Sequence, residues 1–333
     1  MDAPPDDQTD PPADDRSIAR LRRAFGTTVN RHRNSDSRLL PLAVLGLHLG
    51  LAVAAAAFGD LALRAAPRAG WLVYPLVVLF IGTRLRALGN IQHECTHYTF
   101  MPGKRANVIV GRLLALIDFS SFEDYRADHI SHHVHLGELG DRDFAPRRVF
   151  RFEAPSPRPF LDHVVRPLLL LHLRHIFRPV LYAPGDPPAM KVARALYPLF
   201  LVAFAFAVGG KVFLLFACVP YLTTYQMLRY WSDAFDHAGL LGEKDGFLRT
   251  RNHLLPGALL NRIFFPRGDA YHLVHHLFPS LPTVHHARIH HLLMTDAGYA
   301  ARDHALSLRA LGRPAPVADD AGPPCTAQQE PAV

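Results

Sequence analysis

The chain has few cysteines and few charged side chains, and both shortages narrow the possible classes of protein. Its three cysteines, Cys95, Cys218 and Cys325, lie far apart, which excludes a disulfide scaffold, shows no zinc-binding spacing and indicates a reducing compartment. Charged residues are only 20% of the 333 residues and prolines number 28, so neither a coiled coil nor a fibrous repeat is expected. Residues 1–36 lack the apolar stretch of a signal peptide. The mean hydropathy of +0.06 indicates a chain that lies partly in a bilayer and partly in water.

Four apolar stretches predict helices that cross a membrane. Residues 39–58 are long enough, because twenty residues at about 1.5 Å each cover a hydrocarbon core of roughly 30 Å. Residues 71–82 are shorter, and we expect their helix to continue toward His93. Residues 195–208 and 212–228 form a second pair, joined by a tight turn with two glycines. The alternative for each stretch is a buried helix of a soluble protein. The set predicts an all-α integral membrane protein with four transmembrane helices in two hairpins.

Basic residues are divided unequally between the two ends of these stretches. One side carries Arg31, Arg33, Arg38, Arg84, Arg86, Lys191, Arg194 and Arg229, whereas the other carries only Arg64, Arg68 and Lys211. Because basic residues favour the cytoplasmic side, we expect both termini in the cytoplasm and the protein in the inner or plasma membrane of the cell. The net charge of +7 and the arginines before the first span favour an anionic membrane surface over nucleic acid as a partner.

The chain is expected to consist of one domain between two tails. Residues 1–36 predict a disordered basic tail, residues 37–311 a membrane domain, and residues 312–333 a second disordered tail. Within the domain, residues 160–182 are apolar but contain Arg166, Arg174 and Arg178. That pattern predicts an amphipathic helix on the membrane surface.

Histidine is abundant, with 21 residues, and four groups stand at helical spacing. His93 and His97 are four residues apart, as are Asp233 and His237, while the segments 129–133 (HISHH) and 272–276 (HLVHH) share one pattern. Side chains three or four residues apart lie on one helix face, about 5–6 Å apart at Cβ. Adjacent histidines within a pattern differ by about 100° around a helix, so each neighbour can face a different metal ion.

Together these groups supply nine imidazoles, with Asp233 as an additional oxygen donor. The imidazoles belong to His93, His97, His129, His132, His133, His237, His272, His275 and His276. Nine nitrogen ligands are too many for one ion and suit two. Because all the groups stand beside the expected cytoplasmic ends of the spans, a helical cap there would hold a histidine-rich di-metal site. Zinc would use only three or four of these ligands, whereas two irons with open positions would bind O₂.

Two other classes of protein remain open on the residues alone. Residues 93–97 (HECTH) match the zinc metalloprotease pattern, in which Glu94 would act as general base, although this leaves both later histidine groups unexplained. The histidines also allow a metal-binding or metal-transporting membrane protein. A transporter, however, normally places its ligands near the bilayer midplane.

The three histidine segments in this order, divided by an apolar hairpin, resemble the membrane fatty acid desaturase superfamily. The resemblance extends over residues 39–300 and includes HHLFPSLP at 275–282 and GDRDF at 140–144. It implies a desaturase-like catalytic domain in which His93, His97, His129, His132, His133, His272, His275 and His276 bind two iron ions. In relatives of known structure a further histidine follows an asparagine by four residues; His237 matches it, with Asp233 in place of the asparagine. Asp233 would then bind iron, hold a water molecule or orient a neighbour.

The resemblance also implies a reaction and partners. O₂ would be the co-substrate, and electrons would come from a separate ferredoxin or cytochrome b5 with its reductase, because no haem motif (HPGG) is present. The expected product is a double bond in a fatty acyl or lipid-like substrate, carried as acyl-lipid, acyl-CoA or acyl carrier protein. Hydroxylation or ketone formation, or desaturation of a small amino-acid-derived metabolite, are the alternatives. An acyl chain needs an apolar tunnel, for which the aromatics of 200–206 and 213–216 are candidates unless they face lipid.

Overall fold

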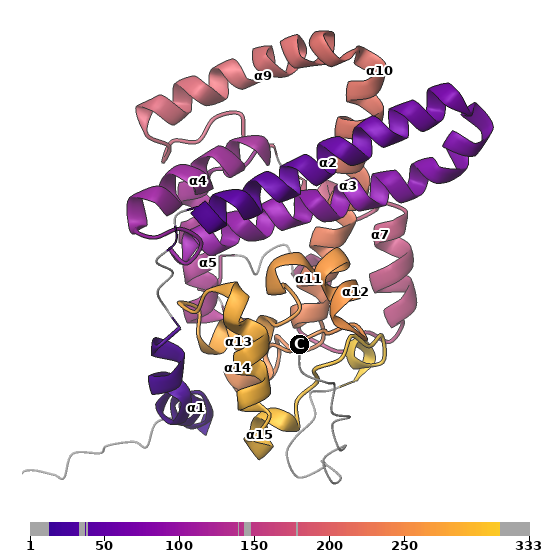
Figure 1. The fold of residues 1–333 in the computed structure, drawn as a ribbon. Helices are drawn as coiled ribbons and strands as arrows, with labels where there is room; N and C mark the ends of the chain where they lie inside the picture. Colours follow the sequence, from indigo (N-terminus) through magenta and orange to yellow (C-terminus); the bar gives the residue numbers. More distant parts are fainter. Residues whose placement is uncertain are drawn as a thin grey trace, which may run out of the picture.

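The protein is built from helices, four of which are long and apolar enough to cross a membrane. The computed structural model describes residues 13–32, 37, 39–138, 140–142, 148–177 and 179–313, and no β-strand occurs among them. The candidate spans are α2 (Leu39–Ala65), α3 (Pro67–Thr96), α9 (Pro188–Val208) and the stretch Gly210–His237. Figure 1 shows α2 and α3 as one hairpin, and α9 followed directly by α10 as the start of another. The prediction of an all-α protein with two such hairpins is confirmed.

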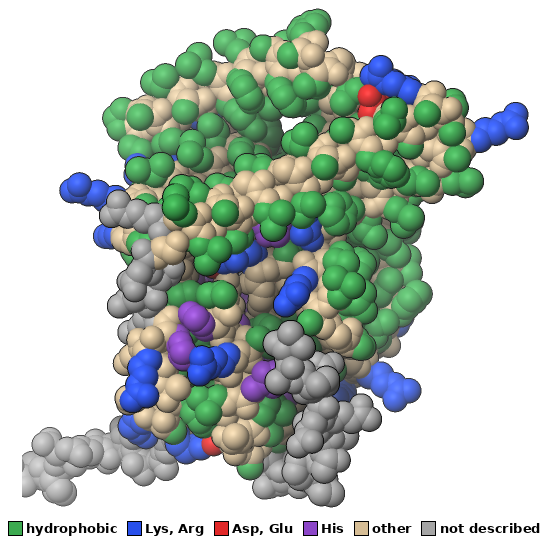
Figure 2. All heavy atoms as spheres, in the orientation of Figure 1, with side chains coloured by type: hydrophobic (Ala, Val, Ile, Leu, Met, Phe, Trp, Pro, Cys, Tyr) green, Lys and Arg blue, Asp and Glu red, His purple; other side chains and the backbone are tan. Residues whose placement is uncertain are grey.

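The first hairpin buries one face and exposes the other. Pro67 occupies the first turn of α3, where its missing N–H costs no hydrogen bond, so a new helix begins directly after α2. The buried face packs Leu63 against Val77 and Ile81. On the outer face Leu72 is 81% exposed. Contiguous apolar surface of this kind is unfavourable in water, and Figure 2 shows it over the whole upper part of the molecule. The protein is therefore a membrane protein.

The second hairpin is less tightly packed. Gly209, at φ 90°, makes the turn between α9 and α10 (Gly210–Phe213), a conformation that glycine adopts without strain. The chain then continues through two π-helical turns, η2 (Leu214–Cys218) and η3 (Tyr221–Tyr225), into α11 (Gln226–His237). Helix α9 keeps most of its apolar side chains outside the core, with Phe206 84% exposed. An opening between α9, α10 and α2 is visible in Figure 2.

Helix α4 (Lys104–Ile117) packs against α3 and α9, and Figure 1 shows it between α9 and the start of α2. The remaining elements form a helical cap, which Figure 1 shows below the two hairpins. They are α1 (Ala13–Asn30), α5 (Phe122–His135), η1 (Leu161–Val165), α7 (Arg166–Leu168), α8 (Leu173–Ile176), η4 (Gly246–Leu248), α12 (Ala258–Phe264), η5 (Pro266–Gly268), α13 (His272–Leu277), η6 (Thr283–His285), α14 (His286–Leu293), α15 (Ala297–Ala300) and η7 (Ala310–Gly312).

Polar side chains on the second half of α3 attach this cap to the membrane helices. Arg86 donates to both carboxylate oxygens of Asp269, at 3.0 and 2.6 Å. One turn further on, the Asn90 amide donates to the carbonyl of Pro266 at 2.8 Å. These contacts fix the loop that leads into α13, so the helix carrying the last histidine group is held against the one carrying the first.

Two expectations on the flanking segments were wrong where the structure describes them. Residues 13–30 form α1 rather than a disordered tail, because Leu21 and Val29 on one face of that helix are fully buried against the cap. Residues 160–182 do not form a single helix: Leu170, at φ 57°, has a left-handed conformation that ends a right-handed helix. Leu168, Leu169 and Leu171 around it are exposed, as expected for a segment at a membrane surface. Residues 1–12, 33–36 and 314–333 of the predicted tails lie outside the described residues.

Candidate metal centre

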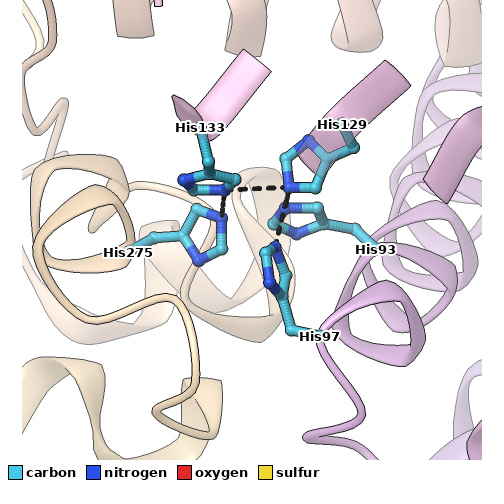
Figure 3. Close-up of side chains that lie close together, drawn as sticks. All are labelled: His93, His97, His129, His133 and His275. Carbon is cyan, nitrogen blue, oxygen red and sulfur yellow. Dashed lines mark hydrogen bonds between the residues drawn. The ribbon is translucent and has the colours of Figure 1, made fainter. Parts of the chain in front are cut away.

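The structure gathers all nine singled-out histidines from four elements into two adjoining groups. Group 1 consists of His93, His97, His129, His133 and His275, and group 2 of His132, His237, His272 and His276. Within each group the ligand atoms lie within 4.8 Å of one another. Figure 3 shows the five imidazoles of group 1 pointing toward a common centre from α3, α5, α13 and the residue after α3.

Helix geometry explains why neighbours in sequence serve different groups. His132 and His133 project from α5 about 100° apart, and His275 and His276 do so from α13. One member of each pair faces group 1 and the other faces group 2. The groups meet where the rings of His133 and His276 lie 4.4 Å apart between centroids. Helices α5 and α13 are therefore shared between the two groups.

The nitrogen atoms of group 1 are arranged for a shared cation rather than for hydrogen bonding alone. His129 Nε2 lies 2.8 Å from the Nε2 atoms of His93 and His97 and 3.0 Å from that of His133. His133 Nε2 lies 2.9 Å from His275 Nε2. A neutral imidazole has a single N–H and a single lone pair, so three such contacts at one nitrogen cannot all be hydrogen bonds. Lone pairs that converge on one point are what a metal ion satisfies.

The spacing between these nitrogens also bears on the type of metal. Ligands about 2.1 Å from a metal lie about 3.0 Å apart at right angles and about 3.4 Å apart in a tetrahedron. Four nitrogen pairs in group 1 lie 2.8–3.0 Å apart, and in group 2 His272 Nε2 lies 2.9 Å from His237 Nε2 and 3.0 Å from His276 Nε2. The remaining ligand atoms of each group lie within 4.8 Å of one another. Group 1, with five imidazoles, therefore offers more ligands than a tetrahedral zinc ion uses, whereas group 2 offers four.

In group 2 the opposite ring nitrogens contact oxygen atoms that orient the imidazoles. His132 Nδ1 lies 3.0 Å from Asp141 Oδ2, and His272 Nδ1 lies 3.3 Å from Asp236 Oδ2. His237 Nδ1 donates to the carbonyl of Arg249 at 3.0 Å. A proton held at Nδ1 leaves the Nε2 lone pair directed into the group, which is the usual arrangement around a metal-bound histidine.

Burial keeps five of the imidazoles outside the membrane-spanning segments neutral. It lowers the pKa of His97, His129, His272, His275 and His276 well below the ordinary value, and neighbouring histidines lower it further. A protonated imidazole has no lone pair for a metal. These groups are therefore ready to bind a cation at neutral pH.

Asp233 does not join either group, so the structure gives no support to it as a metal ligand. Asp236 and Asp141 contact imidazoles of group 2. Asp141 belongs to the acidic motif after the second histidine segment, of which residues 143 and 144 lie outside the described residues. Asp236 carries no sequence signal other than its place directly before His237.

Glu94 has a structural role that contradicts the metalloprotease hypothesis. Both of its carboxylate oxygens accept hydrogen bonds from Arg267, each at 2.8 Å, and the side chain is buried. A general base of a zinc protease must instead reach the metal-bound water. The HECTH segment therefore supplies two imidazoles to group 1 and one ion pair to the cap.

Comparison with known proteins agrees with this geometry. Residues 69–306 match the family described as fatty acid desaturase, and the chain belongs to that family. It is 29% identical over 251 residues to dihydrorhizobitoxine desaturase of Bradyrhizobium elkanii, covering 69% of this chain and 70% of that protein. It is 28% identical to a chloroplastic omega-3 fatty acid desaturase of Glycine max, and this match covers 69% of this chain and 56% of that protein. It is 26% identical to an endoplasmic reticulum acyl-lipid omega-3 desaturase (cytochrome b5) of Arabidopsis thaliana, and this match covers 69% of this chain and 66% of that protein. The chain thus spans little more than half of the soybean protein. It is an oxidoreductase of the desaturase class.

Proposed function

We propose that this protein introduces a double bond into an aliphatic acyl substrate within a membrane, with two iron ions held by groups 1 and 2. The observation that carries the proposal is the convergence of nine imidazoles into two adjoining groups at the end of the membrane helices. Bound iron would supply the O₂-derived oxidant needed at an unactivated C–H bond. Overall, the substrate loses two hydrogens, and these combine with O₂, two electrons and two protons to give two water molecules.

An apolar cavity between the two hairpins supports an acyl substrate. It has a volume of about 830 Å³, and its lining includes Phe204, Phe213 and Phe216. Those aromatics agree with the tunnel hypothesis, whereas Phe200 and Phe206 are exposed and do not line the cavity. Leu85 also lines the cavity, and His93 lies about 12 Å further along the same helix.

Two tyrosines on the stretch between the cavity and the candidate centre are held by hydrogen bonds to Asp118. The Tyr221 hydroxyl, which belongs to the cavity lining, donates to the carbonyl of Asp118 at 2.9 Å. The Tyr225 hydroxyl donates to the Asp118 carboxylate at 2.9 Å. These hydrogen bonds fix the positions of the two aromatic rings.

The orientation and the partners are part of the same proposal. The cap and both termini are assigned to the cytoplasm, on the unequal distribution of basic residues. A separate carrier of the ferredoxin or cytochrome b5 type would supply electrons, and relatives named for each donor support this assignment. The substrate would be an acyl-lipid, an acyl-CoA or an acylated carrier protein.

Product analysis tests the proposal. The protein in lipid nanodiscs, reduced with dithionite and exposed to O₂, should convert an acyl-lipid into a product lighter by two mass units. Purified protein should contain about two irons, and His133→Ala or His276→Ala should remove iron and product together. His135→Ala, an exposed histidine on the same helix as His133, is the matched control and should keep both. A gain of sixteen mass units, or one zinc ion that survives His276→Ala, would contradict the proposal.

A further inference from the structure

Helix α1 presents a basic face to the outside of the cap. Its buried side consists of Ile18, Leu21, Phe25 and Val29, at intervals of three and four residues. The opposite side carries the exposed residues Arg20 and Arg23, and Arg31 follows at the end of the helix. The sequence alone places these arginines in a tail before the first span. The structure makes them one face of a docked helix.

This basic face lies next to the candidate metal centre. Arg22, beside the buried side of α1, donates from Nε to the carbonyl of Leu277 at 2.9 Å and from Nη2 to the carbonyl of His276 at 3.2 Å. His276 is a member of group 2. Only one side chain and one stretch of backbone therefore separate the outer surface of α1 from an imidazole of the centre.

Residues from the end of the cap extend the same surface. The ring of His32 lies 4.8 Å from that of His285, between centroids. Burial lowers the pKa of His285, and the charges of His32 and Arg288 lower it further, so positive groups are concentrated here. Arg288 and His291 are exposed on α14. Asp296, an acidic residue on this side, is bound to Arg20.

We infer that the surface formed by Arg23, Arg31, Arg288 and His291 is the docking site of an acidic electron-carrier protein. The inference rests on the proposed function, which requires electrons from outside the chain. Each docked carrier would be oxidised by one electron, and two such events would supply the two electrons of a turnover. Opposite charges on the two surfaces would speed their encounter and orient the carrier toward group 2.

The position of α1 favours a soluble partner over an anionic membrane as the occupant. In Figure 1 α1 lies at the far end of the cap, well separated from the hairpin turns and from the long apolar helices. It packs against η4 and α13 rather than against a candidate span. The helix that carries the basic face therefore lies outside the region where lipid covers the molecule.

Charge reversal tests the inference. Intact protein in neutral phosphatidylcholine nanodiscs would be assayed with an acidic plant-type ferredoxin and, separately, with an acidic cytochrome b5 haem domain. The triple variant Arg23→Glu, Arg31→Glu, Arg288→Glu should raise the KM for at least one carrier about tenfold at low salt and weaken the dependence of this KM on salt concentration. Iron content and dithionite-driven turnover should stay at the level of the unmodified protein.

A matched control separates docking from a general charge effect. Arg158→Glu with Arg309→Glu reverses two exposed arginines beside η1 and η7, and should leave the KM for the carrier unchanged. An unchanged KM in the triple variant, or an equal rise in the control, would overturn the inference. So would an effect that requires anionic lipid in the nanodisc. Loss of dithionite-driven product in the unmodified protein would instead overturn the proposed function, and carrier binding would then be measured directly.

Discussion

At the scale of single residues, the histidines were predictable from the sequence and their supporting oxygens were not. Helical spacing identified His129, His132 and His133, because side chains three and four residues apart must share a face. The carbonyl of Arg249, which orients His237, is a backbone atom that carries no sequence signal. Asp236 was missed because Asp233 has the more suggestive spacing. Only the fold decides which of the two carboxylates faces His272.

Asp141→Asn should weaken metal binding at group 2. The carboxylate of Asp141 contacts His132 Nδ1 at 3.0 Å, and an amide holds that imidazole less well in the orientation that directs Nε2 into the group. Iron affinity at group 2 should fall about 10- to 100-fold, measured as iron content after dialysis against a chelator. Asp128→Asn, a more exposed carboxylate on α5, should retain its iron. Equal iron loss in both variants would contradict the role of Asp141.

Acid should destabilise the cap through His290. Burial and, to a smaller extent, the charges of His304 and His291 together lower the pKa of His290 to about 3. In the unfolded chain the pKa of His290 has the ordinary value of about 6.5, so the unfolded chain binds a proton first as the pH falls. The stabilising effect of neutral His290 is therefore complete above pH 6.5 and is lost as the pH falls toward 3. At pH 5 the free energy of unfolding is lower by about 2 kcal/mol than at pH values above 6.5. Thermal unfolding at pH 7.5 and pH 5 should show a smaller pH-dependent fall in Tm for His290→Gln; an identical fall would refute this assignment.

At the scale of elements, the spans were predictable because four apolar stretches with basic residues beside their ends have few alternatives. Their close packing was not. Gly82 on α3 touches η3 so closely that a Cβ there would lie 2.2 Å from Thr224 Oγ1 and 3.1 Å from the Thr224 carbonyl carbon. Helix α1 was missed for a related reason: Arg22 and Leu277, which hold it in place, are separated by 255 residues. Contacts between such distant residues cannot be read from a local pattern.

Gly82→Ala should separate the two hairpins slightly and lower stability by about 1–3 kcal/mol, because the added methyl group overlaps Thr224. Activity should fall as well, since α3 carries His93 and the stretch after η3 carries His237. Gly50→Ala is the control on α2, where a Cβ meets nothing within 4 Å. There alanine should leave Tm unchanged or raise it, because it favours a helix more than glycine does. A lower Tm for Gly82→Ala, together with an unchanged or higher Tm for Gly50→Ala, would confirm the close approach of α3 and η3. Equal Tm values in the two variants would contradict it.

At the scale of the whole molecule, the structure adds a cavity to the site that the sequence predicted. The histidine segments predicted chemistry, but the cavity forms only when α2, α3, α9 and η2 come together. Its aromatic lining was foreseen in part, since Phe204, Phe213 and Phe216 belong to stretches with that pattern. Which side of α9 faces inward follows from the packing of the hairpins, and apolar residues occur on both of its sides.

Ala56→Trp should shorten the acyl chain that the protein accepts. Ala56 lines the cavity, so an indole there would occupy space that a long chain needs. Turnover of acyl-lipids with chains of about eighteen carbons should fall at least about tenfold, while shorter chains lose less. Ala54→Trp, on the exposed side of α2, is the control. Chromatography of the product lipids would measure the chain-length profile of each variant. An unchanged profile in Ala56→Trp would argue against the cavity as the substrate site.

The loose packing of α9 has a practical consequence for anyone who isolates this protein. A helix with so few neighbours of its own keeps its place through the molecules that surround it, and the opening beside it lies among apolar side chains. Native lipids then act as part of the interior as well as its surroundings. Harsh, short-chained detergents should let the second hairpin drift, whereas extraction with a patch of the original bilayer should preserve it.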